Sequence, residues 1–264
     1  MTEIIGLFTN NFDYTLLLFL RVSGLILPSP IFGRKTVPGL IKISFICSLT
    51  FIFVLSFPAP AEGIAYGTLL EYVVFCIKEL LFGLAMGYVT TLFFNLVYSA
   101  GQIIDTQIGF GIVSIYDVQN NSQVPVVGSI LNVIMLTVFF CVNGHLRLIA
   151  ILHATFDKIP VGHVLLSLNF VTAMVEAFAL TFVLAIMVAM PILAAGIILE
   201  VAMGVLIRSV PQMNMFVVGI PIKILVGLFV LLISIPVFVN FSNIIFTEMF
   251  QAIEKTFNTF GVLQ

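Results

Sequence analysis

Long apolar runs alternate along the chain with short segments rich in proline, glycine and polar residues. A helix rises 1.5 Å per residue, so a membrane span requires about 20 mostly apolar residues. Six blocks approach that length, namely Tyr14–Leu27, Ile41–Phe57, Leu80–Ala100, Val126–Val142, Val164–Leu199 and Val217–Asn240. The pattern predicts an all-α fold of the integral membrane type.

Two of the six blocks depart from the form of a simple span. The first is short and has Arg21 at its centre, whereas the fifth, Val164–Leu199, is too long for one span and contains Glu176 and Pro191. A proline inside a helix removes a backbone hydrogen bond and crowds the preceding turn. We therefore expect kinked, broken or paired helices in these two blocks.

The segments between the blocks contain clear helix breakers. They are Pro28–Gly39, Pro58–Gly63, Gly101–Pro125 and Pro160–Gly162. None of them forms a linker long enough to separate soluble domains, and no short-period repeat is visible. The sequence predicts a single domain over residues 1–264.

The composition confirms the membrane class and argues against a nucleic-acid partner. Hydrophobic residues make up 61% of the 264 residues, charged residues only 8%, and the mean hydropathy is +1.24. Soluble domains are roughly half apolar and one quarter charged. The 10 basic and 12 acidic residues are scattered singly, so no basic stripe could neutralise a phosphate backbone.

The charges of the connecting segments give no clear orientation in the membrane. With six simple spans, basic residues divide five to four between the two sides when Arg34, Lys35 and Lys42 are placed inside. A chain whose apolar surface is covered by partner proteins need not follow the positive-inside rule. The weak bias therefore favours a chain that depends on partners.

Several charged residues lie within or at the ends of apolar blocks. We predict that the charges of Arg21, Glu176 and Glu200 are buried. Arg208 and Lys223 also lie within or at the ends of apolar runs. An unpaired charge at such a depth costs about 3 kcal/mol or more. Two explanations stay open, because spacing does not separate them: the charges form structural pairs or extend to the interface, or some of them line an aqueous path.

The glycine spacing of Gly83 and Gly87 is typical of helices that pack closely against another helix. The motif is frequent in apolar helices and carries no chemistry, so we expect a packing role.

No pattern of catalytic or ligand-binding residues is present. The three cysteines and three histidines are dispersed, and neither a nucleophile motif nor a metalloprotease helix occurs. Gly109-Phe110-Gly111 lacks the preceding strand and the following lysine of a phosphate loop. We expect no catalytic residues, no metal, no cofactor and no enzymatic activity.

The centre of the segment Gly101–Pro125 is apolar and contains two glycines. Its residues are Ile108, Gly109, Phe110, Gly111, Ile112 and Val113. Non-helical backbone at membrane depth must be buried in protein or line a cavity. Three interpretations remain open on physical grounds, which are a loop packed on its own helices, a constriction that lines a pore, and a loop that docks a partner.

One more segment sets the chain apart from ordinary membrane helices. Charge, amide groups and two prolines lie between apolar runs in Arg208-Ser209-Val210-Pro211-Gln212-Met213-Asn214-Met215-Phe216, followed by Gly219-Ile220-Pro221-Ile222-Lys223. This sequence pattern resembles the signature of the FliR type of flagellar export-gate proteins and their virulence-secretion equivalents. The resemblance extends over essentially the whole chain, through Arg21-Val22-Ser23-Gly24 with Pro28, Pro30, Arg34 and Val37-Pro38, then Ala100-Gly101, Asp105, Gln107 and Gly109-Phe110, then Asn143-Gly144-His145, Phe156 and Pro160.

The resemblance implies a subunit of the export gate of a type III secretion apparatus, in the bacterial inner membrane and the flagellar basal body. It implies a subunit built from helical hairpins with kinked and broken helices. This subunit would join a helical hetero-oligomer with FliP-type and FliQ-type gate subunits, contact an FlhB-type switch protein, and let unfolded flagellar proteins pass. It also implies that Ile108–Val113 forms a plug in the pore.

We expect an assembly joint in the segment that carries the resemblance most clearly. Its residues are Arg208, Pro211, Gln212, Asn214, Phe216, Pro221 and Lys223, because two prolines interrupt the helix there and free carbonyls that amide side chains or a neighbouring chain must satisfy.

The alternative function is a self-contained secondary transporter for a small solute, since intramembrane charges and broken helices are typical of such proteins. The two halves of this chain show no convincing similarity to each other, which favours the gate.

Overall fold

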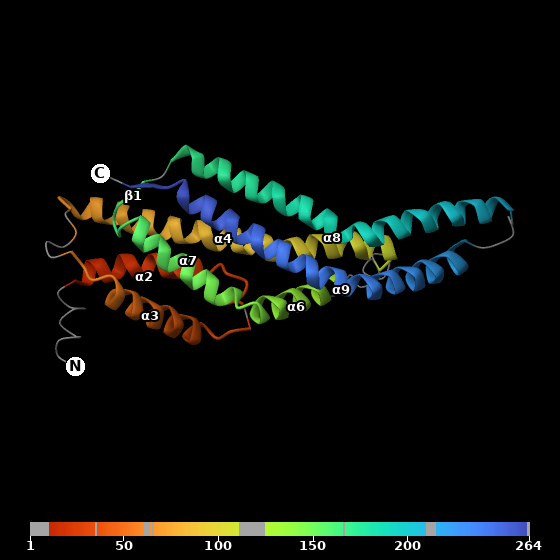
Figure 1. The fold of residues 1–264 in the computed structure, drawn as a ribbon, viewed down its shortest axis with the longest axis horizontal. Helices are drawn as coiled ribbons and strands as arrows, with labels where there is room; N and C mark the ends of the chain where they lie inside the picture. Colours follow the sequence, from red (N-terminus) through yellow and green to blue (C-terminus); the bar gives the residue numbers. More distant parts are fainter. Residues whose placement is uncertain are drawn as a thin grey trace. The chain divides into compact units, whose positions relative to one another are not determined.

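The computed structural model describes residues 11–34, 36–60, 64, 66–110, 125–165, 167–209 and 215–262. Helices dominate this part of the chain, and the predicted all-α fold is confirmed (Figure 1). The helices are α2 (Phe12–Ile26), α3 (Gly39–Ser56), α4 (Leu69–Ile108), α6 (Val126–Cys141), α7 (Gly144–Lys158), α8 (Leu168–Ser209) and α9 (Met215–Asn258). Two short strands, β1 (Val164–Leu165) and β2 (Gly261–Val262), pair antiparallel.

The contacts of the chain group into two compact units that share three long helices. Unit 1 comprises residues 1–92, 143–178 and 248–264, and unit 2 comprises residues 93–142 and 179–247. Helices α4, α8 and α9 contribute residues to both units. The prediction of a single domain over 1–264 stays a prediction.

Prolines and glycines set many of the helix ends. Pro38 and Pro125 directly precede α3 and α6, where the missing N–H of proline costs no helix hydrogen bond. Helix α4 ends directly before Gly109, whose φ of 102° lies in the region that favours glycine. The N–H groups of Gly109 and Phe110 both donate to the carbonyl of Asp105, which satisfies a carbonyl left open at the helix end.

Within the described ranges, four helices are long and apolar enough to cross a membrane, rather than the six predicted blocks. They are α3, α4, α8 and α9, and α6 with α7 would count as a fifth if the break between them were ignored. Helix α2 has only 15 residues before Pro28, and α6 has only 16 before the left-handed Asn143.

The helix breaks expected in the first and fifth blocks are absent. Helix α2 runs unbroken through Arg21, and α8 runs as one helix of 42 residues through Pro191. Helix α9 likewise continues through Pro221 and Pro236. The prediction that Pro221 interrupts a helix is therefore wrong, because neighbouring turns hold the helix where one N–H is missing.

In unit 1, α2 and α4 lie in backbone contact along their glycines, so the packing role expected for Gly83 and Gly87 is confirmed. A Cβ built on Gly24 would meet the backbone of Leu84 at 2.7 Å, and one on Gly83 would collide with the carbonyl oxygen of Arg21. A Cβ built on Gly87 would lie 2.8 Å from the carbonyl oxygen of Leu25. Contact positions increase together along both helices, so the two helices run parallel.

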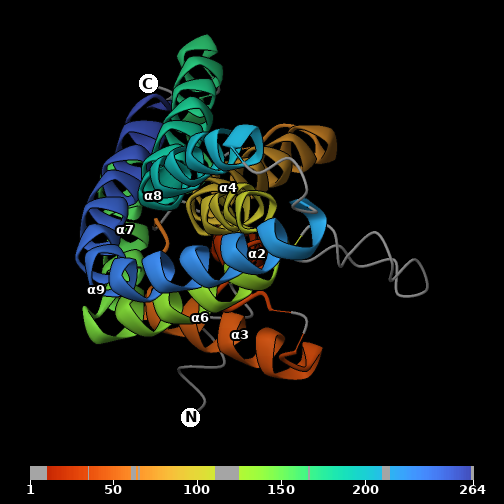
Figure 2. The same cartoon turned by 90° about the vertical axis from the view of Figure 1, so that its right-hand side faces the viewer.

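Aromatic side chains complete the core of unit 1 around α7. Helix α3 packs against α2 (Figure 1), and Figure 2 shows α3 in the same cartoon after a 90° turn. From α3 and its C-terminal end, the rings of Phe53 and Phe57 contact the ring of Phe156 at centroid distances of 5.2 and 5.4 Å. The ring of Phe82 meets that of Phe260 edge-on at 4.7 Å, next to strand β2.

Unit 2 has its own aromatic core and its own close helix contact. Three aromatic rings contact one another in pairs, with centroid distances of 5.2 to 6.3 Å; they belong to Phe94, Phe139 and Phe246. Gly101 of α4 and Gly128 of α6 touch so closely that a Cβ on Gly101 would collide with the backbone of Gly128.

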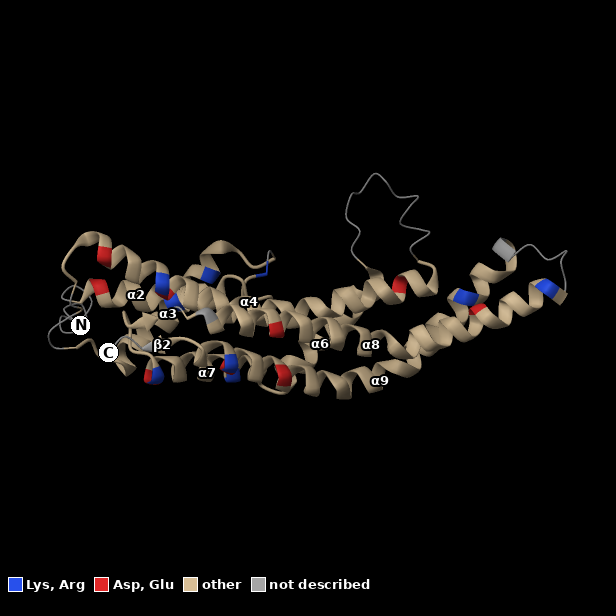
Figure 3. Ribbon diagram, turned by 90° about the horizontal axis from the view of Figure 1, so that it is seen from above, with Lys and Arg blue, Asp and Glu red and all other residues tan. Residues whose placement is uncertain are grey.

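The parts of α8 and α9 in unit 2 leave much of their apolar surface uncovered. In the most apolar window of α9 only 17% of the residues are buried, and in that of α8 only 28%. Few charges interrupt these helices (Figure 3). A continuous apolar surface of this extent is typical of contact with lipid or with partner proteins.

We predict that Gly83→Ala lowers the stability of the protein by about 1–3 kcal/mol, because the new methyl group would force the backbones of α2 and α4 apart. The matched control is Gly39→Ala in the first turn of α3, where a Cβ meets nothing within 4 Å. The measurement is the temperature at which half of the detergent-solubilised protein has been lost from the monodisperse peak. Equal midpoints for the two variants would contradict the close packing.

Candidate functional site

A fully buried ion pair lies at the centre of unit 1. The side chains of Arg21 on α2 and Glu79 on α4 are both 0% exposed. Arg21 Nε donates to Glu79 Oε2 at 2.5 Å and Nη2 donates to Oε1 at 2.9 Å, so the pair is bidentate. This planar, two-bond geometry is the strongest that arginine forms with a carboxylate.

Further groups satisfy the rest of both side chains. Arg21 Nη1 donates to the carbonyl of Ile159 at 2.9 Å, and the N–H of Gly162 donates to Glu79 Oε1 at 2.8 Å. The guanidinium carbon lies 4.9 Å from the ring centroid of Phe82 and 4.6 Å from that of Phe156. The cluster is closed to solvent and fully engaged, so its arrangement indicates a structural role.

The sequence analysis did not identify Glu79 as the buried partner of Arg21, although its position relative to a glycine pointed to it. Arg21 and Glu79 each lie one helical turn before a glycine, Gly24 and Gly83, at which α2 and α4 touch. Helical side chains lean toward the N-terminus, so the two side chains of parallel helices meet one turn before the contact.

Glu176 and Glu200 do not share this burial. The Glu176 side chain is 52% exposed and forms an ion pair with Lys255, and the Glu200 side chain is 54% exposed and forms one with Lys223. The prediction of buried charges is therefore wrong for these two residues within this chain. Each carboxylate lies on the outer surface of α8, opposite a lysine of α9.

The pair of Glu200 and Lys223 belongs to the second candidate site, at the C-terminal end of α4 in unit 2. Lys223 Nζ donates to Glu200 Oε1 at 2.6 Å, and Gln107 Nε2 donates to the same oxygen at 3.4 Å. The side chain of Gln107, including its amide group, lies directly against Gly196 of α8. A polar network thus joins α4, α8 and α9 next to the end of α4.

Beside this network, Ile108 packs into a gap left by a glycine. Its side chain is 1% exposed, and a Cβ built on Gly227 of α9 would meet its Cγ1 at 2.7 Å. Ile108 is the last residue of α4, so the buried side chain fixes the point at which the chain leaves the helix.

Asp105 holds both ends of the segment that follows α4. Its carbonyl accepts the N–H groups of Gly109 and Phe110, and its Oδ1 accepts the N–H of Val127 in the first turn of α6 at 3.2 Å. A carboxylate at a helix N-terminus also interacts favourably with the helix dipole. The chain therefore leaves α4 and enters α6 at positions tied to one residue.

The structure places the predicted plug only in part. Ile108 is helical rather than part of a loop, and residues 101–108 extend α4 beyond the predicted block, so the expectation of non-helical backbone from Gly101 is wrong there. Gly109 and Phe110 form the turn at the helix end. Gly111, Ile112 and Val113 lie outside the described residues.

The predicted joint is likewise described in part. Arg208 lies exposed near the end of α8, and Pro221 and Lys223 lie in the first turns of α9. The backbone of Phe216 belongs to α9, whereas Pro211, Gln212 and Asn214 lie outside the described residues. The structure brings Lys223 and Glu200 together with Gln107 and Ile108 at the start of the predicted plug, a grouping that the sequence did not reveal.

Across the described part of the chain, no group of three histidine, cysteine, aspartate or glutamate side chains is arranged to hold a metal ion.

Comparison with known proteins gives one consistent family. The model of the bacterial export proteins, family 1, matches residues 12–249. The chain is 32% identical to the flagellar biosynthetic protein FliR of Escherichia coli K12 over 88% of each chain, and 30% identical to FliR of Bacillus subtilis 168 over 90% of each. It is 28% identical to the Yop proteins translocation protein T of Yersinia pestis over 80% of each.

We predict that Arg21→Leu destabilises the protein by about 3–5 kcal/mol, because it leaves the Glu79 carboxylate buried without a counter-charge. The double variant Arg21→Leu/Glu79→Leu should recover much of the loss, since no lone charge remains. Lys255→Leu, at the exposed pair with Glu176, serves as control and should change little. Thermal midpoints of the solubilised protein measure all three, and a double variant as unstable as the single one would contradict the role of charge.

We predict opposite effects for two glycine substitutions in unit 2. Gly227→Ala should destabilise, because the new methyl group displaces the buried Ile108 and with it the end of α4. Gly204→Ala in α8, where a Cβ meets nothing within 4 Å, should stabilise by roughly 0.5–1 kcal/mol through helix propensity. The same thermal assay compares them, and a stabilising Gly227→Ala would show that Ile108 is not held there.

Proposed function

Because the chain belongs to the bacterial export proteins, family 1, we propose that it is a gate subunit through which a type III apparatus exports unfolded flagellar proteins. The coarser role, a component of a type III export apparatus, rests on the similarity to FliR proteins and to Yop proteins translocation protein T. The chain is a multi-pass membrane protein of the bacterial cell membrane, and the proposal locates it in the flagellar basal body.

The observation that carries the proposal is the uncovered apolar surface of α8 and α9. A monomer that works alone would have to present this whole surface to lipid, including the positions next to the ion pair of Glu200 and Lys223. FliP-type and FliQ-type subunits would cover part of it in a helical hetero-oligomer, and an FlhB-type switch protein would contact the assembly. The ends of α8 and α9, from Arg208 to Lys223, would form the assembly joint.

In this proposal, Ile108–Val113 closes the export path at rest. The physical support comes from its described beginning, where Ile108 is buried against Gly227 and Asp105 fixes the exit from α4. From this fixed point the sequence continues with Phe110, Ile112 and Val113, which carry no charge and provide apolar bulk. Apolar constrictions exclude water and ions in other pores.

The proposed activity is passive and involves no enzymatic step. The chain would supply a wall and a seal, and an entering polypeptide would displace the seal. The glycines Gly109 and Gly111 allow backbone turns that other residues adopt only with strain, so the seal can move while Ile108 stays packed.

We predict that Phe110→Ser/Ile112→Ser/Val113→Ser makes the bacterial membrane leaky to small ions while the gate still assembles. The variant removes apolar bulk but keeps chain length and the anchor at Ile108. The control is Val73→Ser, at an exposed apolar position of α4. Two measurements are needed, membrane conductance to ions and copurification of the FliP-type and FliQ-type subunits through a tag on this chain.

Two outcomes would overturn the seal. Normal assembly with wild-type conductance would make the segment a packing loop. Loss of copurification would instead assign it to the contacts between subunits.

A further inference from the structure

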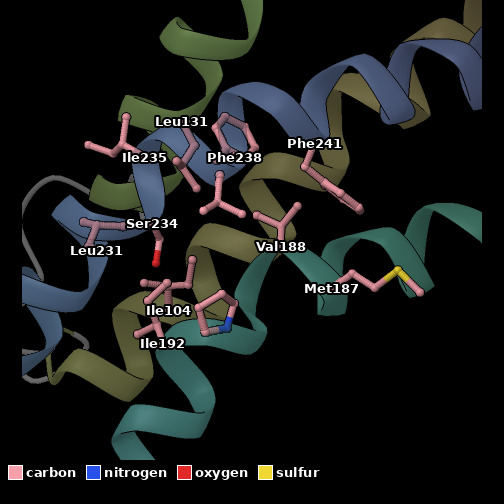
Figure 4. Close-up of a pocket in the computed structure, with 12 residues that line it drawn as sticks. Ile104, Leu131, Met187, Val188, Ile192, Leu231, Ser234, Ile235, Phe238 and Phe241 are labelled. Atoms are coloured by element: carbon pink, nitrogen blue, oxygen red, sulfur yellow. The ribbon is translucent and has the colours of Figure 1, made fainter.

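Unit 2 contains an apolar cavity between four helices. It has a volume of about 90 Å³, and its wall is formed by residues of α4, α6, α8 and α9 (Figure 4). The side chains that define it include Ile104, Leu131, Val188, Ile192, Leu231 and Phe238. It lies within unit 2 and is separate from the charged cluster of unit 1.

The lining offers almost nothing to a polar ligand. Ser234 carries the one side-chain oxygen among the lining residues, and its hydroxyl already donates to the carbonyl of Val230 at 2.8 Å. A buried water requires two to four polar partners, and cavities lined by carbon alone stay dry and bind small apolar molecules. The chemistry of the wall therefore selects hydrocarbon.

The cavity is accessible from an apolar face of the chain. Met187 and Val237 belong to its wall and are 52% and 61% exposed, so the wall continues onto the outer surface of α8 and α9. Among the candidate membrane spans in the described residues, these two helices have the highest mean hydropathy. In a membrane protein, the hydrocarbon available at such a face is the acyl chain of a lipid.

The backbone around the cavity can adapt to an entering chain. Pro191 forms part of the wall, and because it has no N–H, the carbonyl of Met187 lacks its usual partner within α8. Pro236 has the same effect in α9, between the lining residues Ile235 and Val237. Both helices thus lose one stiffening hydrogen bond at the level of the cavity.

We propose that this cavity binds the end of a lipid acyl chain. The bound chain fills space that side chains leave empty and thereby supports the packing of α8 and α9 against α4. The site does not depend on the proposed function of the gate, because its chemistry and access follow from unit 2 alone.

The test uses the full chain, purified with the subunits that copurify with it, in nanodiscs of phosphatidylcholine that carries a diazirine at the end of one acyl chain. After illumination, mass spectrometry locates the labelled residues. We expect label on Met187, Phe238 and Phe241. Val188→Phe, which fills the cavity, should reduce this labelling about tenfold.

The matched control is Val133→Phe on the exposed surface of α6, which should leave labelling at the cavity unchanged. If Val188→Phe does not fold, Leu231→Ala enlarges the same cavity and should raise the labelling instead. Labelling that neither cavity variant changes would overturn the proposal. Absence of label on the lining residues would do so too, and would assign the space to a side chain of another subunit.

Discussion

A charge that has no access to water must be paired within the protein, and this constraint organises unit 1. Arg21 lies in the middle of an otherwise apolar helix, so its folded position is tolerable only where Glu79, the carbonyl of Ile159 and two aromatic rings converge on it. Those groups come from α4, from α7 and from the turn after α7. The requirement of one side chain thereby sets the register of elements that are far apart in the sequence. The glycines at the α2–α4 contact bring the two backbones close enough for the pair to form.

Much of the helical architecture could be predicted from the sequence because apolar runs and prolines act locally. The blocks at Ile41–Phe57 and Val126–Val142 coincide with α3 and α6 to within two residues at each end, since Pro38 and Pro125 mark their starts. Helix α7 was not among the predicted blocks because its histidines, Arg147 and Asp157 interrupt the apolar run. The first turns of α4 were missed for the same reason, because Glu71, Lys78 and Glu79 lower the local hydropathy although the backbone is helical.

The candidate sites were less predictable because they consist of contacts between helices. Spacing along one helix shows which residues share a face, but it does not show that Glu200 meets Lys223 across the connection between α8 and α9. Nor does it distinguish a charge enclosed by neighbouring helices, such as Arg21, from one on the outer surface, such as Glu176. That distinction depends on tertiary packing, which composition alone does not encode.

Asp105 has a consequence for how the length of the chain can vary. One residue receives the N–H groups at the end of α4 through its carbonyl and an N–H at the start of α6 through its carboxylate. The entry and exit of the intervening segment are therefore fixed independently of how many residues lie between them. The entropic cost of closing a loop grows only slowly, by about 0.6 kcal/mol for each doubling of its length. A change in the length of this segment would therefore leave both helix ends in place.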